Sequence, residues 1–414
     1  MKGRIVTDQQ SFIIVGAALA GASAAKTLRD EGFSGEIRML GAELHRPYIR
    51  PPLSKGFLAG NDELDSVFVQ PAEWYAENDV TLSLGVTVDA IDPEAQFVFL
   101  GTGEAVMYDK LLLTTGSSPR MLDVPGTELT GVFTLRTLDD SEGLRAVFSG
   151  GKKVVVIGSG WIGMEVAATA RTLGNDVTVL SRDELPLASV LGDELGRVFL
   201  ELHRENGVVV RTGVGVAELV GDGVGAVTGV RLTSGEVVPA DVVVLGVGAA
   251  PNIQLAEAAG LDIDNGIVVN AALRTSDLQI WAAGDVANAY HPVLKQRLRS
   301  EHWANALNQG PAAAKSMLGQ SVSYDEIPYF YSDQFDLGME YSGYAPLVRG
   351  ASVVYRGDVA AREFIAFWLA EGRVVAGMNV NVWDVNEAVQ GIIRRANVVD
   401  AARLADSSVP LDSL

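Results

Sequence analysis

Two apolar segments of the chain are each followed by a glycine-rich turn and then by a helix-like stretch. The first covers residues 12–21, with the sequence FIIVGAALAG, and the second covers residues 154–163, with the sequence VVVIGSGWIG. Each apolar run is typical of a buried parallel strand. The glycines allow a tight turn, and the start of the helix offers unpaired N–H groups and a positive dipole end to a pyrophosphate. Two such turns predict two bound dinucleotides, with electron transfer between them.

The two turns differ at one position. The first turn carries Ala18 where the pattern usually has its middle glycine, whereas the second turn is complete. One methyl group narrows the approach to a phosphate but does not forbid it. Because a single match also occurs in ordinary strand–helix turns, the prediction depends on the strand and helix that flank each turn. The candidate glycines are Gly16 and Gly21 in the first turn, and Gly158, Gly160 and Gly163 in the second.

The composition excludes several kinds of chemistry. The 414 residues include no cysteine, which excludes disulfides, thiolate catalysis and cysteine-ligated metals. The four histidines show no metal-ligand spacing, and we interpret them as surface or packing residues. A net charge of −20 argues against nucleic acid as a partner. We find no secretory signal and no apolar run of transmembrane length, and we therefore expect a soluble, cytoplasmic protein without a membrane partner.

The order of segments predicts an α/β protein with two Rossmann-like dinucleotide-binding domains and a small α+β domain at the carboxyl end. Residues 12–40 follow a strand–helix–strand pattern, and further buried strands are expected in 108–116, 240–248 and 280–286. Residues 208–238 alternate like antiparallel hairpins, and residues 384–404 resemble closing helices. The expected boundaries give a first dinucleotide-binding domain of residues 1–113 and 244–322, a second of residues 114–243, and a carboxyl-terminal domain of residues 323–414.

An acidic residue after the second strand of such a domain holds a ribose hydroxyl. In the first unit Ala42 occupies the expected place, so Glu43 is the nearest candidate, with a solvated loop glutamate as the alternative. In the second unit Ser181 stands there, followed by Arg182, which can accept the 2′-phosphate of NADP. The alternative is that Arg182 is exposed and that Asp183 holds the ribose.

Residues 45–60 contain a proline-rich turn in which two adjacent prolines disfavour regular structure. A rigid loop beside a cofactor is well suited to hold Lys55. In the alternative, Ser54 caps a short helix and Lys55 is exposed. Further along the chain, Asp285 follows an apolar strand and a glycine and is expected to open a helix. There it can bind a ribityl hydroxyl or serve as an ordinary helix cap.

Taken together, these segments resemble the FAD-dependent ferredoxin reductases of oxygenase and cytochrome P450 electron-transfer systems, which have the glutathione-reductase-like two-nucleotide fold. The resemblance covers nearly the whole chain and is more specific than any single motif. It rests on the residues 16–21, 50–55, 115–116, 135–137, 158–165, 246–252, 284–285, 301–306 and 332–334.

The resemblance implies that FAD lies on the first turn and NAD(P)H on the second. It implies hydride transfer from NAD(P)H to FAD, then release of single electrons to an iron–sulfur ferredoxin, which needs no covalent intermediate. Lys55 and Glu165 are the catalytic candidates, with packing or a structural ion pair as the alternative, and the family favours NADH. Trp161 stands where tyrosine is commoner, and its ring can cover the flavin until nicotinamide displaces it. The residues expected at FAD are Gly16, Ala20, Gly21, Glu43, Arg50, Lys55, Val88, Thr115, Gly116, Arg136, Asp285 and Trp303, and those at NAD(P)H are Gly158, Gly160, Trp161, Ile162, Gly163, Glu165, Ser181, Arg182 and Gly248.

The sequence is also compatible with two other functions. One is a related flavoenzyme with a small acceptor such as a quinone, oxygen or monodehydroascorbate. The other is a flavoprotein related to apoptosis-inducing factor, in which a nucleotide-dependent change of shape matters more than turnover. For the ferredoxin reductase, an acidic ferredoxin would need a local basic patch on this acidic chain. The candidate docking residues are Lys295, Arg297, Arg299, Arg394 and Arg395, and an ordinary solvated basic turn is the alternative.

Overall fold

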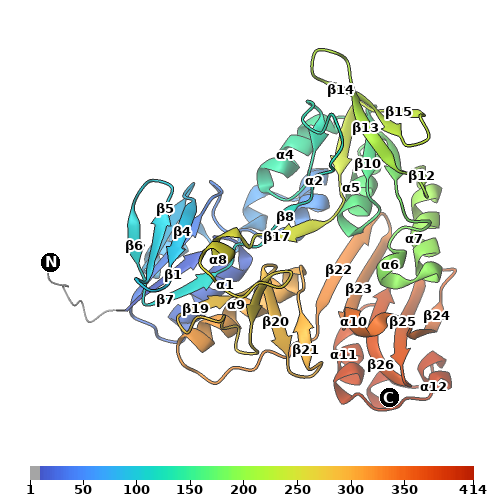
Figure 1. Ribbon diagram of the computed structural model, residues 1–414. Helices are drawn as coiled ribbons and strands as arrows, with labels where there is room; N and C mark the ends of the chain where they lie inside the picture. Colours follow the sequence, from blue (N-terminus) through green and yellow to red (C-terminus); the bar gives the residue numbers. More distant parts are fainter. Residues whose placement is uncertain (1–9) are drawn as a thin grey trace, which may run out of the picture. The chain divides into compact units, whose positions relative to one another are not determined.

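The computed structural model describes residues 10–414 (Figure 1). The chain forms two compact units, and each unit is assembled from segments that are far apart in the sequence. Among the described residues, the first unit consists of 10–49, 64–118 and 250–326, and the second unit consists of 50–63, 119–249 and 327–414.

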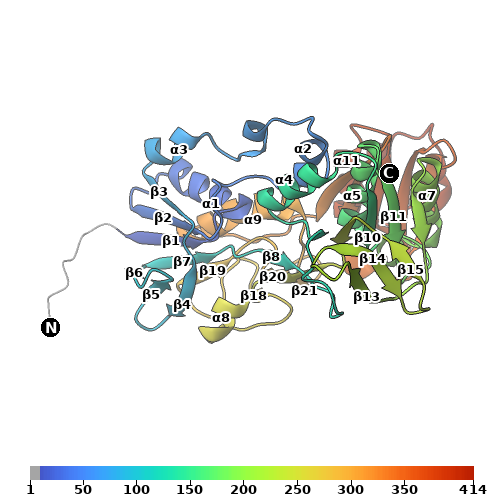
Figure 2. The same cartoon turned by 90° about the horizontal axis from the view of Figure 1, so that it is seen from above.

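The first unit is built around a five-stranded parallel sheet in the order β19-β7-β1-β2-β3. Its central strand is buried on both faces, as the continuous apolar run predicts. Two helices, α1 and α9, lie side by side against this sheet (Figure 2). The elements are β1 (Ser11–Val15), α1 (Leu19–Asp30), β2 (Glu36–Gly41), β3 (Val80–Leu84), β7 (Lys110–Leu113), β19 (Ile280–Ala282) and α9 (Trp303–Met317).

Two small three-stranded sheets complete the first unit. One is the antiparallel sheet β4-β5-β6, and the other is β18-β20-β21, in which β18 and β20 run parallel. A short two-stranded sheet, β8 with β17, forms where the chain passes between the units. These elements are β4 (Val88–Asp92), β5 (Phe97–Leu100), β6 (Ala105–Met107), β8 (Ser117–Pro119), β17 (Ala249–Pro251), β18 (Ile267–Val269), β20 (Ala287–His291) and β21 (Gln296–Leu298), with the short helices η2 (Leu64–Val67), α3 (Ala72–Glu77) and α8 (Gln254–Ala258).

The second unit contains another five-stranded parallel sheet, in the order β12-β11-β10-β16-β9. A three-stranded antiparallel sheet, β13-β14-β15, packs its apolar face against the same core. The elements are β9 (Val132–Phe133), α4 (Leu138–Val147), β10 (Lys153–Ile157), α5 (Trp161–Thr172), β11 (Asp176–Leu180), α6 (Ala188–Leu191), α7 (Asp193–Glu205), β12 (Val209–Arg211), β13 (Val216–Gly221), β14 (Val227–Leu232), β15 (Val237–Pro239) and β16 (Val242–Leu245).

The carboxyl-terminal part of the second unit is a five-stranded antiparallel sheet in the order β22-β23-β26-β25-β24. Its aromatic side chains share one core with α6 and α7, where Phe199 lies with Phe330 and Trp368. The elements are β22 (Tyr329–Gln334), β23 (Leu337–Gly343), α10 (Ala345–Val348), β24 (Ser352–Asp358), β25 (Glu363–Ala370), β26 (Arg373–Val380), α11 (Asn386–Arg395), α12 (Ala401–Ala405) and η3 (Leu411–Ser413).

The structure confirms the expected α/β fold class and corrects three local predictions. The segment at residues 209–211 is not part of a hairpin but is β12, the parallel edge strand of the main sheet. Asp285 opens no helix, because the chain continues into β20 after one turn. The adjacent prolines do not prevent regular structure, since they occupy the first turn of the 3₁₀ helix η1 (Pro51–Ser54), which leads into α2 (Gly56–Ala59). Among the described helices, none is long and apolar enough to cross a membrane.

Candidate active site

Both glycine turns have backbone that requires glycine. Gly16 has a φ of +117°, and a Cβ atom there would lie 2.1 Å from the Thr114 carbonyl oxygen. Gly158 has a φ of +110°, and a Cβ atom there would lie 2.2 Å from the Gly246 carbonyl oxygen. In both turns the first glycine therefore lets the strand end pack directly against a neighbouring strand of its sheet. At Gly160 the space beside the backbone is open: apart from Gly160 and its neighbours in the chain, no described atom lies within 4 Å of the place that a Cβ atom would take.

The helices that follow the two turns begin without a cap. Neither α1 nor α5 has a side-chain cap or an acidic residue in its first turn. Helix α4 differs, since Thr137 and Asp140 form a complete capping box at its start. The uncapped starts leave backbone N–H groups and the positive end of each helix dipole available to an anion. The residues of both turns therefore fit the pyrophosphate of a dinucleotide.

Among the expected FAD residues of the first unit, Thr115, Gly116 and Asp285 lie in segments that follow strands, and Ala20 lies in α1. Thr115 exchanges two hydrogen bonds of 2.8 Å with Asn252, one from each side chain to the other residue's carbonyl oxygen. The Ser117 hydroxyl donates to Asp285 Oδ2 at 2.9 Å. Ala20 lies beside Gly284, whose N–H donates to Gln309 Oε1 at 2.8 Å. The Asp285 carboxylate, in the turn after β19, is thereby held in one orientation, as a contact with a ribityl hydroxyl would require.

Glu43 is not a solvated loop glutamate. Its carboxylate accepts a hydrogen bond from the hydroxyl of Tyr48, which is 3% exposed. In the same unit, Val88 begins β4, Gly116 follows Thr115 with a φ of +66°, and Trp303 begins α9. Sequence reasoning did not identify Tyr48 as a partner of Glu43, and no local signal marks it.

The other expected FAD residues, Arg50, Lys55 and Arg136, belong to the second unit. The guanidinium of Arg50 donates to the carbonyl oxygen of Arg136, so these two residues lie together. The backbone N–H of Arg136 in turn donates to Asp140 Oδ2 at 2.9 Å, beside the capped start of α4.

Ser181, directly after β11, has a partner on the second glycine turn that the sequence did not predict. Its hydroxyl lies 2.7 Å from the Ser159 hydroxyl and accepts from the N–H of Asp183 at 3.1 Å, and the side chain is 3% exposed. The bond with Ser159 ties the end of β11 to the glycine turn. Arg182 and Asp183 are both exposed, so both alternatives stay open: Arg182 for a 2′-phosphate and Asp183 for a ribose hydroxyl.

The remaining residues expected at NAD(P)H lie at the start of α5 and after β16. The ring of Trp161 packs edge-on against Phe199 and Phe330, with centroid distances of 5.6 and 5.0 Å. Ile162 is 46% exposed, and Gly248 has a φ of +104°. The contacts of Trp161 therefore tie α5 to α7 and β22.

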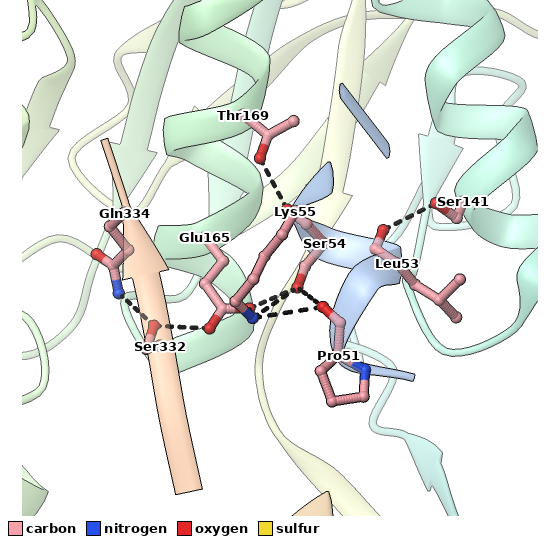
Figure 3. Close-up of polar contacts among 9 residues, drawn as sticks. All are labelled: Pro51, Leu53, Ser54, Lys55, Ser141, Glu165, Thr169, Ser332 and Gln334. Atoms are coloured by element: carbon pink, nitrogen blue, oxygen red, sulfur yellow. Dashed lines mark hydrogen bonds and ion pairs between the residues drawn. The ribbon is translucent and has the colours of Figure 1, made fainter. Parts of the chain in front are cut away.

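Lys55 and Glu165 form an ion pair, with Lys55 Nζ 2.7 Å from Glu165 Oε2 (Figure 3). The two side chains are 14% and 3% exposed. The same Oε2 accepts from the Ser54 hydroxyl at 2.5 Å, and Oε1 accepts from the Ser332 hydroxyl at 2.7 Å. The alternative of an exposed Lys55 beside a capping Ser54 is therefore wrong, because both side chains are directed to the Glu165 carboxylate.

Two backbone contacts hold the segment that carries Lys55. The Ser141 hydroxyl donates to the Leu53 carbonyl oxygen, and the Thr169 hydroxyl donates to the Ser54 carbonyl oxygen, each at 2.8 Å (Figure 3). The carbonyl groups at the end of η1 are thereby satisfied by side chains of α4 and α5. The ion pair thus rests on a short helix that is anchored at both sides.

Two ionisable side chains of β22, Tyr331 and Asp333, interact electrostatically with this pair. The Lys55 ammonium lies 5.5 Å from the centre of the Tyr331 ring. Burial and nearby carboxylates raise the pKa of Tyr331 to about 12. Burial also raises the pKa of Asp333, and the Lys55 charge opposes that rise. The site thus holds one ammonium and two carboxyl groups, and burial makes the Asp333 carboxyl harder to ionise.

The candidate docking residues differ in exposure. Lys295 and Arg297 are exposed near the β20–β21 turn, although Arg297 also donates to the Val269 carbonyl oxygen at 2.8 Å. Arg299 is not an exposed cation, because its side chain is 14% exposed and forms an ion pair of 2.5 Å with Glu301. Its pairing leaves it a weak docking candidate. At the end of α11, Arg394 and Arg395 are exposed.

Comparison with known proteins agrees with this geometry. The model of the pyridine nucleotide-disulphide oxidoreductase family matches residues 10–310, and that of the reductase C-terminal family matches residues 329–414. The chain is 40% identical over 408 residues to the probable ferredoxin reductase CtmF of Castellaniella defragrans, with 98% of each chain covered. It is also 40% identical to the ferredoxin–NAD⁺ reductase component of the anthranilate 1,2-dioxygenase system of Burkholderia cepacia, with 97% of this chain and 98% of the relative covered.

A solved structure shows the same relationship. The crystal structure of the covalent putidaredoxin reductase–putidaredoxin complex superposes with a TM-score of 0.93 and 37% identity, covering 98% of this chain and 97% of the other. The sequence matches and the structural match both extend over nearly the whole chain. The chain therefore belongs to the pyridine nucleotide-disulphide oxidoreductase family and, within it, to the ferredoxin reductases.

Proposed function

We propose that the protein carries electrons from NAD(P)H through FAD to a ferredoxin that serves a cytochrome P450 or a Rieske-type oxygenase. Bound FAD supplies the chemistry that the side chains lack, because it accepts a hydride and releases electrons one at a time. The observation that carries the proposal is the combination of two uncapped glycine turns with a chain that has no cysteine. Electrons therefore have no dithiol in the chain to reduce and leave to an external carrier.

The similar proteins support the proposed acceptor. CtmF is named as a probable ferredoxin reductase, and the relative from Burkholderia cepacia is a component of a dioxygenase system. The similar solved structure holds a reductase joined to putidaredoxin. These proteins support a ferredoxin as partner over a quinone, oxygen or monodehydroascorbate.

We assign the chain's own residues as follows. The N–H groups at the starts of α1 and α5 bind the two pyrophosphates, and Asp285 and Glu43 orient hydroxyl groups of FAD. Lys55 and Glu165 are the proposed catalytic pair, in which the ammonium is neutralised by a carboxylate that accepts from two serine hydroxyls. Because both side chains are largely buried, little water competes for their charges. The pair is therefore a polar group that is fixed in position and carries almost no net charge.

The domain division supports the same assignment. The strands of the first parallel sheet all fall within residues 1–113 and 244–322, which we propose to bind FAD. Four strands of the second parallel sheet lie entirely within residues 114–243, which we propose to bind NAD(P)H, and the fifth, β16, begins there. The five-stranded antiparallel sheet falls within residues 323–414. We further propose that NADH is preferred over NADPH and that the protein acts in the cytoplasm.

The test is a comparison of acceptors. The reconstituted flavoprotein is reduced by NADH or NADPH in a stopped-flow instrument, and turnover is then measured with candidate ferredoxins through cytochrome c reduction. A quinone, oxygen and glutathione disulfide serve as alternative acceptors. We expect ferredoxin to give the highest kcat/KM and glutathione disulfide to give none. A higher kcat/KM with a quinone or oxygen would contradict the proposed acceptor.

A further inference from the structure

A line of buried hydrogen bonds runs from the Glu165 carboxylate to His203. Glu165 Oε1 accepts from the Ser332 hydroxyl at 2.7 Å, and the Ser332 oxygen lies 3.1 Å from Gln334 Nε2 (Figure 3). Gln334 Oε1 lies 2.9 Å from His203 Nε2. None of these four side chains is more than 3% exposed. We call Ser332, Gln334 and His203 the β22–α7 relay, because they lie on strand β22 and helix α7.

Only one direction of hydrogen bonding satisfies every member of the relay. A carboxylate only accepts, so the single hydroxyl proton of Ser332 must be directed to Glu165. Ser332 must then accept from the amide N–H of Gln334, which turns the Gln334 carbonyl oxygen towards His203. A carbonyl oxygen also only accepts, so His203 must carry its proton on Nε2.

The opposite arrangement would endanger the hydrogen bond to Glu165 Oε1, which Ser332 alone donates, while Oε2 would keep Ser54 and Lys55. If His203 carried its proton on Nδ1 alone, Nε2 would accept, and the amide of Gln334 would have to turn over. Its oxygen would then compete with Glu165 for the one proton of Ser332. A buried carboxylate that loses a hydrogen-bond donor is strongly destabilised, so the imidazole tautomer and the Glu165 carboxylate are coupled through two side chains.

The surroundings of His203 favour a neutral ring with one defined tautomer. Burial lowers the pKa of the imidazole to about 4, while the hydrogen bond with Gln334 opposes the shift. The Phe335 ring lies edge-on at 5.1 Å, and Nδ1 has no hydrogen-bond partner among the described residues. An unpartnered Nδ1 is less costly as a bare nitrogen than as a buried N–H donor. His203, interpreted from the sequence as a surface or packing residue, thus belongs to the polar network of the site.

We propose that His203 and Gln334 are positioning residues of the active site, which hold the Ser332 hydroxyl as a permanent donor to Glu165. The inference rests on the proposed function only in that Glu165 acts beside the nicotinamide. The groups that face Glu165 are then Lys55 and Ser54 from the η1 segment and Ser332 from β22, with Asp333 and Tyr331 nearby on the same strand. Strand β22 therefore contributes to hydride transfer from NAD(P)H.

The structure offers a matched control for Ser332. Ser342, on the neighbouring strand β23, is also fully buried and has the same pattern of bonds. Its hydroxyl donates to Asn386 Oδ1 at 2.7 Å and accepts from Gln390 Nε2 at 3.0 Å. Removing the hydroxyl of Ser342 thus removes the same two kinds of hydrogen bond from the same sheet, but the acceptor is an amide oxygen and not a carboxylate.

The first test compares reduction of the bound flavin by NADH in Ser332→Ala, Gln334→Met, Ser332→Thr and Ser342→Ala. We expect the limiting rate constant to fall about tenfold in the first two variants, as for loss of one hydrogen bond to a charged group. The Kd for NADH and the flavin content should stay unchanged. Ser332→Thr keeps the hydroxyl and should reduce within about twofold of the wild-type rate, as should Ser342→Ala. A wild-type rate in Ser332→Ala, or an equal loss in Ser342→Ala, would overturn the proposal.

The second test determines which nitrogen of His203 carries the proton, and it does not require turnover. Long-range ¹H–¹⁵N NMR spectra of the holoprotein at pH 7, assigned with His203→Gln, report the tautomer of His203. We expect a neutral ring with its proton on Nε2, and a changed Nε2–H signal in Glu165→Gln but not in Ser342→Ala. A proton on Nδ1, a charged ring, or an unchanged signal in Glu165→Gln would refute the relay. If instead the wild-type flavin is not reduced by NADH or NADPH, the proposed function fails while this result still stands.

Discussion

Replacing Lys55 by methionine would leave the Glu165 carboxylate buried without its counter-ion. Removing one partner of a buried ion pair typically costs about 3–5 kcal/mol of the free energy of unfolding. Two observations place the expected cost at the lower end of this range. Lys55 keeps 14% of its side chain exposed, and the hydroxyls of Ser54 and Ser332 still donate to the carboxylate. We therefore expect Lys55→Met to lose about 3 kcal/mol.

A double-mutant cycle isolates the interaction itself. Glu165→Gln removes the negative charge while keeping the shape of the side chain, so it should recover part of the stability lost in Lys55→Met. We expect a coupling free energy of about 2 kcal/mol between the two positions. The exposed pair of Arg231 and Glu218, whose atoms are 2.5 Å apart, serves as the control and should couple by less than about 1 kcal/mol.

The assay is urea unfolding at saturating FAD, followed by tryptophan fluorescence for the wild type, both single variants and the double variant. Saturation with FAD removes differences in flavin occupancy from the comparison. If the double variant loses the sum of the two single losses, Lys55 and Glu165 are not energetically coupled and the reasoning fails.

Three further predictions concern other parts of the chain. The pKa of His203 falls from 6.5 to about 4 on folding, so the unfolded chain binds a proton more readily between these pH values. The free energy of unfolding should therefore drop as the pH falls from about 6.5 to 4, and His203→Gln should flatten this pH dependence in unfolding measurements. Arg182→Ala should raise the KM for NADPH far more than that for NADH, and equal effects would show that Arg182 does not contact the 2′-phosphate. Charge reversal at Lys295 and Arg297 should raise the KM for ferredoxin at low salt without slowing flavin reduction, and unchanged kinetics across ionic strengths would place the docking site elsewhere.

Local patterns in the sequence were sufficient to predict the fold class. The strands β1 and β10 and their helices were expected because an apolar run, a glycine turn and a helix are neighbours in the sequence. The tight turns at Gly16 and Gly158, where the structure shows positive φ, were expected for the same reason. The segment at 209–211 was predicted wrongly because a three-residue parallel edge strand carries no periodicity that separates it from a hairpin.

The site was predicted only in part, because its contacts join distant segments. Lys55 and Glu165 were both expected, but their pairing joins residues 110 positions apart. The resemblance included Ser332 and Gln334 without giving them a role, and His203 was interpreted as a surface or packing residue. Hydrogen bonds of this kind depend on the packing of α7 against β22, which no local pattern specifies.

The central claim is that electrons pass from NAD(P)H to a ferredoxin through a flavin and no thiol. An anaerobic titration with NADH, followed at the flavin absorbance band, tests it most directly. We predict full bleaching after one equivalent of NADH per FAD, and full recovery after two equivalents of an oxidised one-electron ferredoxin. Bleaching that requires a second equivalent of NADH, or a reduced flavin that ferredoxin does not reoxidise, would contradict the account.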